Sequence, residues 1–124
     1  MCSKSFKILE LDLLNITKAD LDFSNEYNLK ITRDDKVHGL VAWFDVEFKN
    51  MKYPSFISTS PHKKPTHWKQ VVFYTDKDFY VRKGDELYGS IAIRKSQTNF
   101  RDLDVKISYK KGRDVDFVNL YKFK

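Results

Sequence analysis

The residues that build disulfides and zinc sites are scarce in this sequence. Its 124 residues include one cysteine, Cys2, and three histidines. A single cysteine cannot form a disulfide framework or a Cys/His zinc array. The scarcity of cysteine points to a reducing compartment, so we expect an intracellular protein located in the cytoplasm, the nucleus or both.

The histidines and glutamates do not cluster either. His38, His62 and His67 lack the i,i+4 spacing that places two imidazoles on one face of a helix, and the four glutamates lie in separate segments. We therefore expect no metal site and no paired-carboxylate site.

Glycine is also scarce, which excludes the common nucleotide-binding motifs. The four glycines are Gly39, Gly84, Gly89 and Gly112, and none belongs to a Gly-x-Gly-x-x-Gly cluster or a P-loop. A Gly-x-Ser-x-Gly nucleophile elbow is missing as well. We expect that this chain binds no cofactor by itself.

Long apolar runs are absent. No run approaches the ~20 residues of a membrane-spanning helix, and the first residues lead into alternating sequence without a signal peptide. We expect no membrane partner and no secretion.

The residues that are present suit a folded domain. Hydrophobic residues make up 41% and aromatic residues 15%, while 23 Lys and Arg against 17 Asp and Glu give a net charge of +6. This balance suits an acidic or nucleic-acid partner, but charges of both signs are spread along the chain, which favours an ordinary mixed surface. The length indicates one domain over residues 1–124.

Period-two alternation of apolar and polar residues recurs along the chain and predicts strands. Leu9, Leu11 and Leu13, for example, share one face of such a pattern. The predicted strands cover residues 9–13, 27–31, 37–49, 69–74, 87–94 and 102–110.

Turn-like tetrapeptides separate neighbouring strand patterns. They are Arg33–Lys36, Arg82–Asp85 and Lys111–Asp114, and Thr17 is predicted to cap a single helical turn that includes Lys18 to Asp20. No amphipathic helix of about ten residues or more is visible. The pattern predicts an all-β fold, an antiparallel β-barrel-like domain of about nine to ten strands with at most one short helical turn.

One loop carries the most informative residues. Thr66-His67-Trp68-Lys69-Gln70 follows the polar, proline-marked stretch Ser58–Pro65 and opens the strand-like run Val71–Tyr74. Imidazole and indole both join a polar group to an apolar body, so the pair can be presented to another surface. Taken alone, a histidine near a turn is more often structural, and a tryptophan can simply pack in a core.

This loop resembles the THW loop of the protein arginine N-methyltransferases. Four further segments resemble motifs of that family in the same order, namely His38–Phe48, Val81–Ile91, Asn99–Asp104 and Tyr121–Lys124. Five ordered motifs cover essentially the whole chain, so the resemblance is far more specific than any one of them.

The resemblance implies that this chain is the C-terminal β-barrel of a type I-like enzyme, following the dimerisation arm. In that family an N-terminal domain binds AdoMet, and a pair of glutamates upstream of the barrel grips the substrate guanidinium. We therefore expect the AdoMet-binding domain and the arm to be absent here and the chain to be inactive alone. The parent protein is expected to form a homodimer through the arm.

The implied reaction is methyl transfer from AdoMet to an arginine side chain of a protein substrate. The resemblance gives His67 an assisting catalytic role, in which it orients an acid of the missing domain and helps to carry the departing proton. It makes Thr66 and Trp68 substrate-binding residues, Thr66 by shaping the turn and Trp68 by edging the arginine pocket. The basic spacer His62–Pro65 departs from the family and would repel arginine-rich substrates unless the loop points away.

Two rival readings belong to other classes. A free-standing basic β-barrel could bind single-stranded nucleic acid through stacking aromatics and a cationic groove. Steeply salt-dependent oligonucleotide binding would favour that reading. The other rival is a structural barrel in a catalytically dead paralogue. The residues that could serve nucleic-acid binding are Tyr74, Tyr80 and Tyr88 with Lys77, Arg82 and Lys83.

Overall fold

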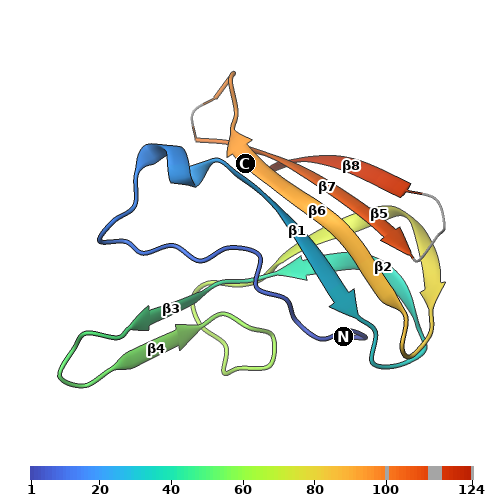
Figure 1. Cartoon of the computed structure of the whole chain (residues 1–124), viewed down its shortest axis with the longest axis horizontal. Helices are drawn as coiled ribbons and strands as arrows, with labels where there is room; N and C mark the ends of the chain where they lie inside the picture. Colours follow the sequence, from blue (N-terminus) through green and yellow to red (C-terminus); the bar gives the residue numbers. More distant parts are fainter. Residues whose placement is uncertain (100, 112–115, 124) are drawn as a thin grey trace. The chain divides into compact units, whose positions relative to one another are not determined.

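The computed structural model of the protein describes residues 1–99, 101–111 and 116–123. Within these residues the chain forms one 3-10 turn and eight strands (Figure 1). They are η1 (Lys18–Leu21), β1 (Phe23–Lys30), β2 (Asp35–Ala42), β3 (Asp45–Phe48), β4 (Ser55–Ser58), β5 (Val71–Val81), β6 (Glu86–Lys95), β7 (Leu103–Lys111) and β8 (Asp116–Phe123).

The predicted fold class is confirmed. The pairings of β1 with β6, β6 with β7, β7 with β8 and β3 with β4 are antiparallel. The single helical turn follows Thr17, as predicted, and the Asp20 carboxylate accepts the Thr17 N–H at 2.9 Å. The described residues hold eight strands, fewer than the nine to ten expected. None of their helices has the length and apolar character needed to cross a membrane.

Strand contacts divide the chain into two compact units. Unit 1 comprises Met1–Val37 and Phe79–Lys124, and unit 2 comprises His38–Asp78. Unit 1 contains the four-stranded sheet of order β1-β6-β7-β8, whereas unit 2 contains the β3-β4 pair and most of the β2-β5 pair.

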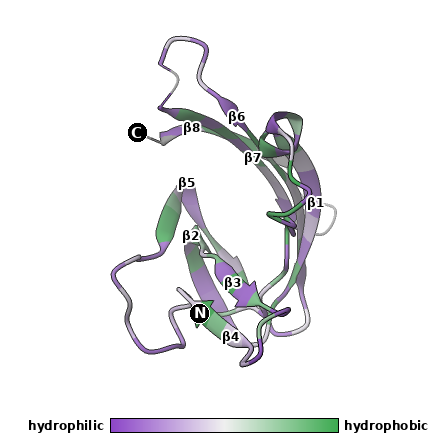
Figure 2. Cartoon of the chain, turned by 90° about the vertical axis from the view of Figure 1, so that its left-hand side faces the viewer, coloured by the Kyte–Doolittle hydropathy of each residue, from purple (hydrophilic) through white to green (hydrophobic). Residues whose placement is uncertain are grey.

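The core of unit 1 lies on one face of its four-stranded sheet. On β7, Val105, Ile107 and Tyr109 are each 2% exposed, while the intervening Lys106 is exposed and Ser108 is half-buried. Hydrophobic and hydrophilic residues are accordingly interspersed along the same strands (Figure 2). Period-two burial follows from the pleat of a strand, which sends successive side chains to opposite faces.

A tyrosine crosses this sheet above a glycine. Tyr27 of β1 is paired with Gly89 of β6, and its hydroxyl donates a 2.9 Å hydrogen bond to the carbonyl oxygen of Ser108 on β7. A Cβ at Gly89 would lie 2.5 Å from the Tyr27 hydroxyl oxygen and would overlap the Ser108 oxygen. Only glycine therefore leaves room for the ring, whose burial raises the pKa of Tyr27, with Tyr109 and Tyr121 adding to the effect.

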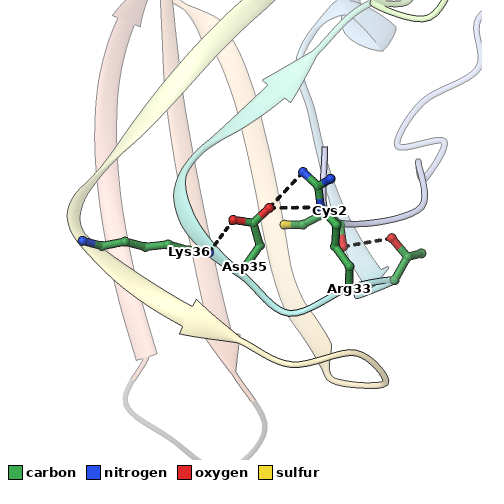
Figure 3. Close-up of polar contacts among 5 residues, drawn as sticks. Cys2, Arg33, Asp35 and Lys36 are labelled. Carbon is green, nitrogen blue, oxygen red and sulfur yellow. Dashed lines mark hydrogen bonds and ion pairs between the residues drawn. The ribbon is translucent and has the colours of Figure 1, made fainter.

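The connection between β1 and β2 is held by short polar contacts (Figure 3). The Asp35 carboxylate accepts the Lys36 backbone N–H at 2.8 Å and the Arg33 Nε–H at 3.1 Å, and Arg33 Nη2 lies 2.9 Å from it. The carbonyl oxygen of Cys2 accepts the Thr32 N–H at 2.8 Å, which ties the N-terminal segment to this connection. The Lys36 backbone bond is the largest cause that lowers the pKa of Asp35, and Arg33 adds to it.

The predicted strand over residues 9–13 is wrong. These residues form no strand and lead into a turn in which the Asp12 carboxylate accepts the Leu14 N–H at 3.0 Å and the Asn15 side-chain amide at 2.7 Å. A side chain that bonds the nearby backbone offers an alternative to a strand ladder. Leu13 and Leu14 are 73% and 84% exposed.

The predicted strand over residues 37–49 is two strands with different partners, since β2 pairs with β5 and β3 pairs with β4. Phe44 lies between them, and its backbone bonds with Thr59. The strand predicted over residues 69–74 instead begins at Val71 and runs through polar residues to Val81. Of the predicted turns, Arg82–Asp85 is confirmed by a 2.9 Å Asp85 N–H to Arg82 carbonyl bond, with Gly84 at φ 94°.

The other two predicted turns end differently. Asp35 and Lys36 already belong to β2, so the turn at Arg33 is shorter than expected. Lys111 belongs to β7, and the rest of the predicted Lys111–Asp114 turn lies outside the described residues.

Gly89→Ala tests the crossing of Tyr27. We expect the free energy of unfolding to fall by about 1–3 kcal/mol, because the methyl group overfills the space between the ring and the Ser108 carbonyl. Urea unfolding of the chain measures it. Tyr27→Phe removes only one hydrogen bond and should cost about 1 kcal/mol. Full stability of Gly89→Ala would contradict this packing.

Asp35→Asn tests the polar connection of Figure 3 through its pH dependence. The folded-state pKa of Asp35 lies below its unfolded value, so its stabilising contribution is complete above the unfolded value and is lost as the pH falls through the folded one. We expect Asp35→Asn to be less stable than the parent at pH 7 and the difference to shrink toward pH 3. Glu26→Gln, at an exposed position, should show no such trend in the same urea titrations.

Candidate functional site

The predicted His-Trp loop connects β4 to β5 in unit 2. Its first residue, Thr59, is bonded to the backbone of Phe44. The Thr59 hydroxyl accepts the Phe44 N–H at 3.0 Å and donates to the Phe44 carbonyl at 2.8 Å, and the Thr59 N–H donates to the same carbonyl at 3.0 Å. Thr59 is 2% exposed. Thr59 is therefore buried at the end of a strand, and its hydroxyl and N–H are bonded to the Phe44 backbone.

The last residue of the loop is tied to the first. Gln70 donates from Nε2 to the Thr59 carbonyl oxygen at 2.7 Å, just before β5 begins at Val71. A surface loop with adjoining ends and its own internal contacts is an Ω-loop, a form often used for function. We call residues 59–70 the site loop.

Within the site loop, the His67 and Trp68 side chains meet edge to face. Their ring centroids are 5.8 Å apart with an interplanar angle of 83°, and the Trp68 ring lies 6.3 Å from that of Phe44 at 66°. The Thr66 hydroxyl donates to the Trp68 carbonyl at 2.7 Å, which shapes the turn between them. Trp68 is 54% and Phe44 47% exposed, and His67 is exposed as well.

The structure therefore places all three predicted site residues, Thr66, His67 and Trp68, in one loop of unit 2 whose ends are hydrogen-bonded to each other. Within residues 1–99, 101–111 and 116–123, the His67 imidazole makes no hydrogen bond or ion pair. A histidine that transfers protons is normally oriented by a second group. No group of three or more His, Cys, Asp or Glu side chains in the described part could hold a metal ion.

The first half of the site loop is a basic turn, which we define as Ser60–Lys64. The Lys63 N–H donates to the Ser60 carbonyl at 3.1 Å, and the His62 N–H donates to the Ser60 hydroxyl at 3.2 Å. Residues 61 to 64 are exposed and Ser60 is half-buried. Among the described residues, the Lys63 and Lys64 side chains form no ion pair. The basic spacer noted in the sequence thus faces solvent.

The residues considered for nucleic-acid binding divide between the two units. Tyr74 and Lys77 belong to unit 2, whereas Tyr80, Arg82, Lys83 and Tyr88 belong to unit 1. In unit 1, the Nζ of Lys36 lies 5.6 Å from the centre of the Tyr80 ring, a cation–π contact that the sequence did not indicate.

The supporting residues of the site loop were missed by sequence analysis. Phe44 was assigned to the middle of a long strand, and neither Thr59 nor Gln70 was assigned a structural role. The available signal was the position of Thr59 in Ser58-Thr59-Ser60, because a short hydroxyl side chain beside a strand end commonly bonds the backbone.

Comparison with known proteins gives the family. A family model described as the arginine methyltransferase oligomerization subdomain matches residues 1–114. Protein arginine N-methyltransferase 1 of Schizosaccharomyces pombe is 45% identical over 107 residues, which cover 86% of this chain and 32% of that protein. Protein arginine N-methyltransferase 8-B of Danio rerio is 40% identical over 102 residues, covering 82% and 24%.

Solved structures show the same fold. The Trypanosoma brucei PRMT1 enzyme–prozyme heterotetrameric complex with AdoHcy matches 100% of this chain and 40% of its own, with a TM-score of 0.95 at 23% identity. Arabidopsis thaliana protein arginine methyltransferase 10 has a TM-score of 0.91 at 20% identity, covering 100% and 39%. The chain spans a third or less of the length of the two curated relatives named above. Given the family-model match and the identity to these relatives, the chain belongs to the arginine methyltransferase family and corresponds to its oligomerization subdomain.

Proposed function

We propose that this chain is the substrate-side domain of a type I-like protein arginine N-methyltransferase, which transfers a methyl group from AdoMet to arginine side chains of proteins. The observation that carries the proposal is the exposed His67–Trp68 pair, presented on a loop whose ends are tied, in a chain of this family. Such a pair suits one wall of a site whose other walls lie on another domain.

The three site residues take different roles in this proposal. His67 is a positioning residue that orients an acid of the AdoMet-binding domain and helps to carry the departing proton. Trp68 edges the arginine pocket, and Thr66 holds the turn through its bond to the Trp68 carbonyl. Methyl transfer depends chiefly on alignment and electrostatics, so a wall held in one geometry contributes to rate.

AdoMet is the proposed methyl donor of the parent protein, bound by a domain outside this chain. The solved relative from Trypanosoma brucei is a complex with AdoHcy, the product of such a donor, and is an assembly of enzyme and prozyme. We propose that the parent oligomerises, with a homodimer through the arm as the expected form. The intracellular location stays a prediction.

The chain alone is expected to bind no AdoMet and to methylate no arginine peptide, because its four glycines form no nucleotide-binding cluster. Calorimetry with AdoMet and an assay of AdoHcy release measure these outcomes. Adding the separately expressed AdoMet-binding part should restore transfer. Methyl transfer by the chain alone would contradict the proposed division of labour.

His67→Ala in the full-length protein is expected to lower kcat by about 10- to 100-fold with a smaller change in KM, since the acid loses the group that orients it. The pH dependence of kcat should shift as well, which a purely structural role would not cause. AdoHcy release over a pH series measures both.

His62→Ala is the matched control for His67→Ala, because His62 is the other exposed histidine of the site loop. Its kcat should stay within about twofold of the parent, as for surface changes generally. Equal losses in the two variants would show that the loop, and not the His67 imidazole, is what matters.

A further inference from the structure

The basic turn carries a feature that the proposed methyl transfer does not use. Ser60-Pro61 is the single Ser/Thr–Pro dipeptide in the 124 residues, and Lys63 follows three residues after the serine. A serine followed by proline, which has no N–H, and by a cation at the third position is the pattern that proline-directed protein kinases with an acidic pocket recognise.

The structure places this pattern where an enzyme can reach it. Pro61, His62 and Lys63 are exposed and Ser60 is half-buried, and a 3.1 Å bond from the Lys63 N–H to the Ser60 carbonyl closes the turn. In the described part of the chain, the Ser60 hydroxyl accepts the His62 N–H at 3.2 Å. Opening this turn breaks the Lys63–Ser60 and His62–Ser60 hydrogen bonds and exposes no buried apolar side chain, because residues 61–64 are already exposed.

The site loop and the residue before it also concentrate positive charge. Residues 58–70 contain Lys63, Lys64 and Lys69 and no Asp or Glu, so their formal charge is +3 with neutral histidines. A phosphoserine brings about −1.5 to −2 charges at pH 7. One phosphate at Ser60 would therefore reduce the local charge to about +1.

We propose that Ser60 is a phosphorylation site for a proline-directed serine/threonine kinase and that its phosphate weakens the repulsion between the basic turn and arginine-rich substrates. The Ser60 Oγ attacks the γ-phosphorus of ATP, forming the Oγ–P bond. The bond from that phosphorus to the bridging oxygen breaks, ADP leaves and the hydroxyl proton passes to the base of the kinase.

The consequence for substrate binding rests on the proposed function. Cationic peptides that approach the His67–Trp68 wall meet the exposed ammonium groups of Lys63 and Lys64. Charges in solvent interact weakly and are screened by salt. The phosphate is expected to tighten binding of an arginine-rich peptide about two- to fivefold at low salt and to have no effect at ~0.5 M salt.

The modification is tested on the folded chain with a cyclin-dependent kinase and Mg·ATP, and mass spectrometry locates the phosphate. We expect one phosphate, on Ser60, and none in Ser60→Ala. Lys63→Ala should lower kcat/KM of the kinase about fivefold, whereas Lys64→Ala, its matched neighbour, should change it less than about twofold. A synthetic peptide of residues 55–70, in which the turn is not held by the folded domain, gives the reference rate of phosphorylation.

Two results would overturn the site. One is phosphate on other residues or on none. The other is a folded chain that is modified less than about 1% as fast as the peptide, which would show that the native turn does not open to the kinase.

The effect of the charge is tested by direct binding of a labelled arginine-rich peptide to the full-length protein, with and without phosphate at Ser60, at two salt concentrations. Equal affinity in both forms at low salt would refute the charge effect. Because this readout needs no methyl transfer, a full-length protein that binds the peptide more tightly when phosphorylated but releases no AdoHcy would refute the proposed function and leave the phosphorylation site standing.

Discussion

The contact between Thr59 and the backbone of Phe44 is the constraint on which the site loop depends. A buried hydroxyl without a partner costs about 1–3 kcal/mol, and Thr59 avoids that cost by bonding both the N–H and the carbonyl of Phe44. The same contact holds Phe44 between β2 and β3, where its ring lies against that of Trp68. One side chain thus fixes the residue between two strands and the start of a loop, which Gln70 then closes.

Alternation of apolar and polar residues predicts a strand where every second side chain is buried, as in β7, where Val105, Ile107 and Tyr109 are buried. It fails where one side chain competes with the ladder. Asp12 turns residues 9–13 away from a strand. At the site, the motif identified Thr66, His67 and Trp68, but no local pattern reveals that Phe44, fifteen residues before Thr59, supports them, because that contact exists only once β3 and β4 have paired.

The exposure of the Trp68 and Phe44 rings has an energetic meaning. An aromatic side chain can bury about 150–250 Å², so leaving half of one in water forgoes roughly 2–3 kcal/mol at ~25 cal/mol per Å². The two rings nevertheless hold a defined edge-on geometry, with Trp68 on a loop closed at both ends and Phe44 between β2 and β3. An apolar pair that is fixed in place and uncovered within its own unit is suited to contact with another domain.

The chemistry of His67 leads to the same conclusion by a separate route. An imidazole becomes a directed acid or base when a second group fixes which nitrogen carries the proton. Residues 58–70 contain no carboxylate that could do so, and the only ring that contacts His67 in the described structure is Trp68, which packs against its edge. On the proposed function, the partner that sets the proton position belongs to the AdoMet-binding domain. Because the His67 imidazole is exposed in this chain, a residue of the other domain can reach it.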